Sequence, residues 1–301
     1  MIPTLPLPDR TVLLDGGMGR ELRNRGVPIL DTIWSANGLI VAPDTVRRVH
    51  EDYIAAGAEI ITTNSYGIIR AELAKEGIEH RCAELNHIAG ALAQEARDRS
   101  GRKVFIAGSL PPLRGSYRPD RVGSFAEIEP LYEEQASLLA PYCDVMLCET
   151  MSSASEAVAA ATAAAMTGLP VWVSWTLHED NSGRLRSGET VTEAARAIAH
   201  LPVSAFLVNC CSPESITAAM PALARLPGGI VGGYANAFRP VPPDWDMERD
   251  GLLALRDDLD PESYAEHAGH WHDAGARIVG GCCGTGPAHI ARLKALTETK
   301  R

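Results

Sequence analysis

Short apolar runs alternate with helix-compatible stretches along the whole chain. Apolar residues such as Val46 and Val49 recur at helical spacing on one face of 44–57. Eight other runs are rich in β-branched or aliphatic residues and are brief enough to be strands buried on both faces. They are 12–15, 59–63, 103–107, 143–148, 171–175, 205–208, 229–233 and 277–280. The pattern predicts a repeated strand–helix unit.

Two kinds of start signal mark the helices that follow these strands. Capping-box spacing, in which Ser or Thr is followed three residues later by Glu, begins at Ser153 and at Thr190. A cap residue stands directly before a first-turn proline at Ser212 and at Asp260. These signals support the helix assignments.

Eight strands alternating with helices predict a single (β/α)8 TIM barrel that forms one domain over residues 1–301. A doubly wound open sheet is the alternative. The chain lacks a Gly-x-Gly-x-x-Gly turn after its first strand, which removes the dinucleotide-binding form of that alternative. Two connections, 16–43 and 234–260, are long for a compact domain. We expect them to be extended loops that cover an active site at the C-terminal face or mediate assembly.

The composition narrows the class of protein. Apolar residues make up 46% of the chain and charged residues 22%, which is enough for one large core and excludes disorder. A net charge of −10 without a basic run argues against nucleic-acid partners. Neither a secretory leader nor an apolar run of about 18 residues is present, so we expect a soluble cytoplasmic protein with no membrane partner. A homo-oligomer is compatible with the sequence.

Seven cysteines are present, and four of them form two adjacent pairs. An odd number with such pairs is a poor match to a secreted disulfide framework. Free thiols or metal ligands fit better.

Reactive side chains follow the predicted strands. In a barrel, the positions just beyond the C-terminal ends of the strands carry the chemistry. Here they are Asp15, Asn64, Ser109, Glu149, Trp175, Asn209-Cys210, Asn236 and Cys282-Cys283.

Three of the cysteines can converge on one metal ion. The adjacent pair Cys282-Cys283 has glycines on both sides, so its backbone can leave strand geometry and direct both thiols to one point. Cys210 follows the sixth predicted strand, which lies two strands away in the barrel from the strand before Cys282-Cys283. Three protein ligands leave the fourth position of a tetrahedral zinc open, as in catalytic sites. By spacing alone, small buried cysteines, a tight turn or a vicinal disulfide remain alternatives.

Four segments of the chain carry a resemblance to a known family. They are LLDGGMGREL at 13–22, CET at 148–150, VNC at 208–210 and, most specific, GGCCGTGPAHI at 280–290. Together they span nearly the whole chain and resemble the homocysteine S-methyltransferases. That family includes betaine-homocysteine and S-methylmethionine-dependent enzymes and the homocysteine module of methionine synthase.

The resemblance implies a (β/α)8 barrel in which Cys210, Cys282 and Cys283 hold Zn²⁺ and the thiol of homocysteine completes the tetrahedron. Cys211 stands where relatives vary and is left out of the ligand set. The other three cysteines, Cys82, Cys143 and Cys148, are expected in the core.

The resemblance also implies a site for the amino-acid end of homocysteine. Asp15 and Glu149 correspond to carboxylates that relatives place near this end of the substrate, where they would attract its ammonium group. Backbone N–H groups of Gly16 and Gly17 could receive the substrate carboxylate.

A methyl transfer that forms methionine follows from this arrangement, because a metal-bound thiol is held as the thiolate nucleophile. The donor would be an onium compound, which aromatic faces attract, and the candidates are Trp34, Tyr66 and Trp175. Thr150 stands where betaine-using relatives carry a tyrosine. A sulfonium such as S-methylmethionine is therefore expected ahead of betaine.

Three other functions share parts of this pattern. In the first, homocysteine is methylated from a folate or corrinoid. Because this chain has no room for domains that bind those cofactors, a partner protein would have to carry the donor. A non-catalytic zinc- or thiol-binding barrel is a second alternative, and the charged groups at the strand ends argue against it. A cysteine hydrolase is disfavoured because no histidine follows a predicted strand; His178 and His289 are expected in a loop and a helix.

Overall fold

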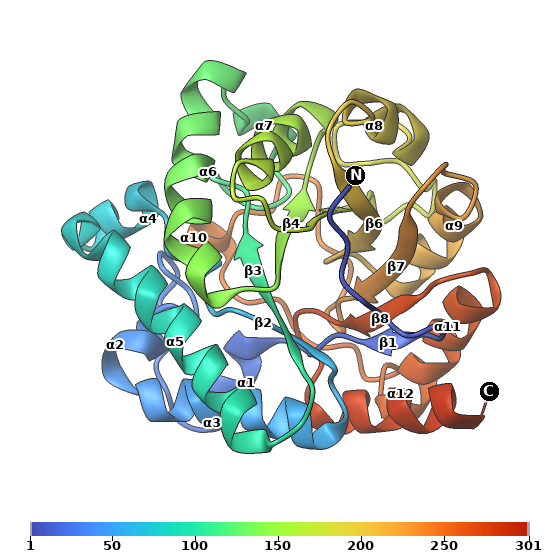
Figure 1. Ribbon diagram of the computed structural model, residues 1–301, viewed down its shortest axis with the longest axis horizontal. Coiled ribbons are helices and arrows are strands. Elements are labelled where there is room, and N and C mark those ends of the chain that lie inside the picture. Colours follow the sequence, from blue (N-terminus) through green and yellow to red (C-terminus); the bar gives the residue numbers. More distant parts are fainter. Residues whose placement is uncertain (1, 300–301) are drawn as a thin grey trace.

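The computed structural model describes residues 2–299, in which eight strands form one parallel sheet surrounded by helices (Figure 1). The strands are β1 (Val12–Leu13), β2 (Ile60–Thr62), β3 (Phe105–Leu110), β4 (Val145–Met151), β5 (Val171–Trp175), β6 (Val203–Asn209), β7 (Ile230–Ala235) and β8 (Ile278–Gly281). Each of the eight runs predicted from the sequence overlaps one of them. The observed bounds differ from the predicted ones by at most three residues at either end, and β5 coincides with its predicted run.

The sheet closes on itself. Its order is β1-β8-β7-β6-β5-β4-β3-β2, so β1 and β2 are its two ends. A parallel bridge between Leu14 and Ile60 joins them, and Asp15 N donates to Ile60 O at 3.0 Å. The predicted (β/α)8 barrel is confirmed, and the open sheet is excluded.

Helices and short 3₁₀ turns connect consecutive strands and form the outer ring (Figure 1). The α-helices are α1 (Met18–Asn24), α2 (Asn37–Val41), α3 (Pro43–Ala56), α4 (Arg70–Lys75), α5 (Cys82–Ser100), α6 (Phe125–Leu139), α7 (Ala154–Ala165), α8 (Val191–Ala197), α9 (Pro213–Leu223), α10 (Met247–Asp250), α11 (Pro261–Asp273) and α12 (Pro287–Thr299). The long connections 16–43 and 234–260 therefore contain short helices. Among the described residues no helix has the length and apolar character needed to cross a membrane.

The helix starts follow the sequence signals with one difference. Thr190 forms a complete capping box with Glu193, and Ser212 and Asp260 cap helices that have proline in the first turn. Ser153 also caps its helix. The carboxylate of Glu156, however, accepts from Ser152 rather than from Ser153, so that box is not reciprocal.

Two layers of apolar side chains follow from the alternation of the strands. One lies inside the barrel, where Leu5 and Leu7 from the segment before β1 pack against it. The other lies between the strands and the helices. In β4, Val145 and Leu147 belong to the inner layer, while Cys148 belongs to the outer one. Cys82 and Cys143 are also buried in the outer layer, as expected of core cysteines.

Candidate active site

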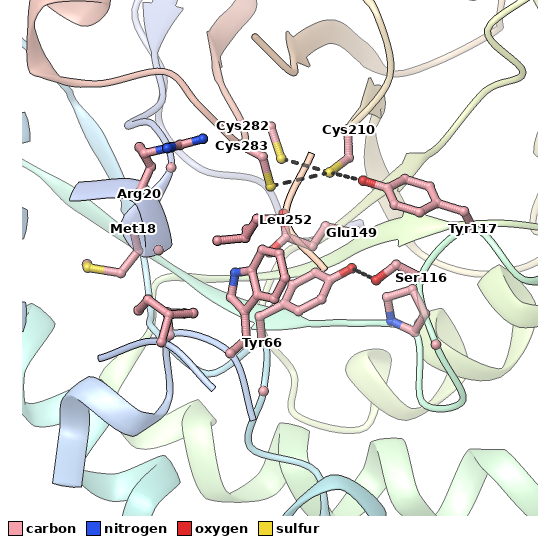
Figure 2. A pocket seen from close by; sticks show the side chains of 18 of the residues that line it. Met18, Arg20, Tyr66, Ser116, Tyr117, Glu149, Cys210, Leu252, Cys282 and Cys283 are labelled. Carbon is pink, nitrogen blue, oxygen red and sulfur yellow. Dashed lines mark hydrogen bonds between the residues drawn. The ribbon is translucent and has the colours of Figure 1, made fainter. Parts of the chain in front are cut away.

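A cavity of about 380 Å³ opens at the C-terminal ends of the strands. Its lining includes all three predicted metal ligands, both predicted carboxylates and residues from the two long connections. Figure 2 shows the cysteines on one side of this cavity, with Glu149 and Tyr66 nearby. Residues at or just after the C-terminal ends of every strand except β5 thus meet at one mouth, as the barrel prediction requires.

The three cysteines lie close together although two of them are more than 70 positions from the third. The Sγ atom of Cys210 is 3.1 Å from that of Cys282 and 3.9 Å from that of Cys283. All three sulfur atoms lie within 4.8 Å of one another. Sulfur atoms bound to one tetrahedral zinc at about 2.3 Å are about 3.8 Å apart, so the trio fits that ion.

The backbone leaves strand geometry at both cysteine segments. Cys210, directly after β6, has a φ of +55°, a conformation that non-glycine residues rarely adopt. The turn after β8 is closed by Thr285 N donating to Cys282 O at 3.2 Å, and Gly284 in this turn has a φ of +86°. A Cβ atom on Gly17 would lie 2.7 Å from Cys282 O, so only glycine permits this approach.

Hydrogen bonds among the three cysteines shift their pKa values in opposite directions. Hydrogen bonds from the thiols of Cys282 and Cys283 lower the pKa of Cys210 well below the usual cysteine value. The same hydrogen bonds with Cys210 raise the pKa of the other two thiols. Of the three thiols, Cys210 therefore gives up its proton most readily, and binding of a dication would displace the protons of all three.

Two buried carboxylates face the same cavity. Asp15 accepts hydrogen bonds from Thr62 N at 2.8 Å and from Thr62 Oγ1 at 3.0 Å. Glu149 accepts from Ser109 Oγ at 2.5 Å and from Tyr234 OH at 3.1 Å. Burial raises the pKa of each to about 7. A cation entering the cavity would favour their ionised forms, so the pair can recognise an ammonium group.

The two glycines predicted for substrate binding line the cavity but are not equivalent. Gly17 N donates to Thr285 O at 3.0 Å, so its N–H group is already used in holding the turn after β8. Within residues 2–299, the Gly16 N–H group makes no such bond and stays free for a carboxylate.

The predicted donor-binding aromatics divide into two groups. Trp34 and Tyr66 line the cavity. Trp175 does not: it is fully buried, belongs to the outer layer and stacks on Phe206 with ring centroids 6.1 Å apart. The expectation that Trp175 binds the donor is therefore wrong. Successive side chains of a strand face opposite sides of the sheet, and since Trp172 and Ser174 face the barrel interior, Trp175 points outward.

Several cavity residues were missed from the sequence. They are Arg20, Tyr117, Tyr234, Phe238, Trp245 and Leu252. Most of them lie in loops, where no periodicity indicates the direction of a side chain. The direction of Tyr234 could have been predicted from strand alternation, because Val231 and Ala235 in β7 face outward and Tyr234 therefore faces the barrel interior.

Within the described part of the chain, Cys210, Cys282 and Cys283 are the one group of three or more His, Cys, Asp or Glu side chains that could hold a metal ion. Cys211 is fully buried in the outer layer and takes no part in it. Three thiols without a fourth protein ligand suit a catalytic rather than a structural site.

Comparisons with known proteins agree with this geometry. The family model described as Homocysteine S-methyltransferase matches residues 12–297. Homocysteine S-methyltransferase of Escherichia coli strain K12 is 32% identical over 307 residues, covering 94% of each chain. Homocysteine S-methyltransferase YbgG of Bacillus subtilis strain 168 is 29% identical, covering 98% of this chain and 96% of the relative.

Solved structures extend the likeness to three dimensions. The metallated form of the homocysteine methyltransferase MmuM from Escherichia coli superimposes with a TM-score of 0.81 at 30% identity, covering 96% of each chain. Its apo form gives a TM-score of 0.72. A metal is thus bound by a relative of the same fold, and this chain belongs to the homocysteine S-methyltransferase family of enzymes.

Proposed function

We propose that this protein transfers a methyl group from an onium donor to the thiolate of homocysteine, giving methionine, with Zn²⁺ held by Cys210, Cys282 and Cys283. The observation that carries the proposal is the meeting of three thiols and two buried carboxylates in one cavity. When bound, zinc would hold the thiol of homocysteine as a thiolate at neutral pH.

The carboxylates would orient homocysteine. Asp15 and Glu149 lie on separate strand ends, and their ionised forms can both accept hydrogen bonds from the ammonium group of the substrate. The free N–H group of Gly16 would receive its carboxylate. With its ammonium and carboxylate groups fixed, the substrate would have its sulfur atom facing the cysteines. This orientation would hold the nucleophile ready for reaction.

The aromatic side chains would hold the donor. Trp34 and Tyr66 offer ring faces to a methylated sulfonium or ammonium group. The methyl group would move from that cation to the sulfur of homocysteine as the donor's bond to it breaks. The donor then leaves as a neutral molecule, so its departure needs no general acid.

A sulfonium such as S-methylmethionine is favoured over betaine. Thr150 is fully buried, and its side chain accepts from Asn209 Nδ2 at 2.9 Å. Betaine-using relatives carry a tyrosine at this position, and the threonine here offers no aromatic ring to a methylated ammonium group. The remaining aromatic faces suit either cation.

The decisive experiment incubates zinc-loaded protein with homocysteine and, separately, S-methylmethionine, S-adenosylmethionine and glycine betaine, and measures methionine. Methionine from a sulfonium is expected. Formation from betaine alone would contradict the donor preference, while no methionine from any donor with zinc bound would contradict the proposed activity. In that case a partner-borne folate or corrinoid donor would be tested next.

A further inference from the structure

Tyr117, in the loop between β3 and α6, contacts one of the cysteines. Its hydroxyl oxygen lies 2.9 Å from Cys210 Sγ. Figure 2 shows that Cys282 and Cys283 approach Cys210 from one side and Tyr117 from the other. Because a metal-bound cysteine is a thiolate and has no proton, the phenol must be the donor when a metal is present.

Both partners of this contact have unusual backbone conformations. The φ of Tyr117 is +65° and that of Cys210 is +55°. Non-glycine residues adopt such angles at a cost and keep them where the surrounding structure enforces them, often at functional sites. Two residues in this conformation contact each other through their side chains, which indicates that the surrounding structure holds this contact in place.

The ring of Tyr117 is held on two sides. The guanidinium carbon of Arg186 lies 4.9 Å from the ring centroid, and the ring of Trp245 meets it edge-on at 5.6 Å. A cation over the face of a phenol draws electron density from the ring and makes its O–H group a stronger donor. The arrangement therefore both fixes and strengthens the hydrogen bond to Cys210.

Arg186 is itself held by a buried ion pair. Its Nη2 atom lies 3.1 Å from Glu179 Oε1, and the two side chains are 2% and 11% exposed. Glu179 also accepts from Ser212 N at 2.9 Å, two residues beyond Cys210, and from Val241 N at 3.3 Å. The pair thus ties the loops after β5, β6 and β7 to the ring that contacts Cys210.

The charge of the metal centre gives this network a role. Three cysteine thiolates and a substrate thiolate around a dication carry two net negative charges in a buried place, where unmet charge is costly. A hydrogen bond to one thiolate withdraws part of that charge, so the ion keeps more attraction for the remaining ligands.

We propose that Tyr117, held by the Arg186–Glu179 pair, is a positioning residue of the metal centre that donates a hydrogen bond to the Cys210 thiolate and so sets metal affinity and sulfur charge. The inference rests on the metal site of the proposed function. It does not depend on which methyl donor the protein uses.

The test compares Tyr117→Phe with Tyr66→Phe. Each removes one phenolic hydroxyl from the same cavity, but that of Tyr66 contacts Ser116 Oγ at 2.7 Å. The readouts are zinc affinity, by competition with a chromophoric chelator, and the sulfur-to-metal charge-transfer band of the Co²⁺-substituted protein. Tyr117→Phe should raise the Kd for zinc about tenfold and move the band to longer wavelength, because sulfur without the hydrogen bond gives up charge more readily. Tyr66→Phe should change both readouts much less, because the Tyr66 hydroxyl bonds to the side chains of Ser116 and Thr150 rather than to a cysteine.

A second variant, Glu179→Gln combined with Arg186→Met, removes the ion pair without leaving either charge buried alone. Its band should shift in the same direction, and adding Tyr117→Phe should shift it little further. A wild-type band and Kd in Tyr117→Phe would overturn the inference, as would an equal shift in Tyr66→Phe. Both readouts are taken without substrates, so a failure of methyl transfer would contradict the proposed function and leave this test intact.

Discussion

The Sγ atoms of Cys210 and Cys282 lie 3.1 Å apart although the residues are 72 positions apart in the chain. They follow β6 and β8, which are separated in the sheet by β7. Side chains from alternate strands of a barrel reach the same level, which explains how distant segments supply one ligand set.

Replacing Cys210, Cys282 or Cys283 by Ser should abolish methyl transfer and bound zinc while the barrel stays folded. A serine hydroxyl remains protonated and is a poor zinc ligand, and the large core does not depend on the metal. Metal analysis, methionine formation and far-UV circular dichroism measure the three effects. Cys211→Ala is the control, since this fully buried residue lies outside the trio. Full activity in Cys282→Ser would end the zinc mechanism.

Asp15→Asn and Glu149→Gln should each reduce kcat/KM for homocysteine by about 10- to 100-fold, because each removes a charge-assisted hydrogen bond of about 1.5–3 kcal/mol. Steady-state kinetics with 4-mercaptobutyrate, which lacks the amino group, gives the control. The two substitutions should affect that thiol much less. An equal loss for both thiols would show that the carboxylates do not bind the ammonium group.

Glu149→Gln should also change the pH dependence of stability in the metal-free protein. The folded-state pKa of Glu149, about 7, lies above the ordinary value of 4.5. Its contribution to stability is therefore present below pH 4.5 and lost as the pH rises through 7, which amounts to about 3 kcal/mol. The variant should melt above the wild type at pH 8 and level with it at pH 4. A lower Tm at both pH values would contradict this.

His50 should destabilise the protein in acid. It is fully buried, neither ring nitrogen has a hydrogen-bond partner within the described residues, and burial lowers its pKa to about 4. The unfolded chain binds the proton more readily, so stability falls as the pH decreases from 6.5 towards 4. His50→Leu should raise Tm more at pH 5 than at pH 8. The same change at exposed His200 should have little effect at either pH.

Trp34→Leu should raise KM for the onium donor by about 2- to 30-fold, the equivalent of a cation–π contact of 0.5–2 kcal/mol, with KM for homocysteine nearly unchanged. Trp175→Phe is the matched control. Because Trp175 packs in the outer layer, the variant should lower Tm and leave both KM values as they are. Donor KM measured on the two variants distinguishes a binding tryptophan from a packing one.

The sequence alone predicted the barrel, which the structure confirms, and the three cysteines, which the structure brings together. Eight short apolar runs separated by helical stretches leave few ways to pair strands, and the glycines around Cys282 and Cys283 indicate a backbone turn before any coordinates are known. The motif resemblance then assigned Asp15 and Glu149, which the structure places in the same cavity as the cysteines.

Only the tertiary structure decided which loop side chains complete the cavity. Trp175 was expected at the site but packs in the outer layer. Tyr117 was not expected there, yet its hydroxyl contacts Cys210 and Arg186 lies over its ring. Strand periodicity determines direction within a strand, but a loop residue points where its backbone angles and distant neighbours hold it. Those long-range contacts have no signature in the local sequence, because they form only once the barrel closes.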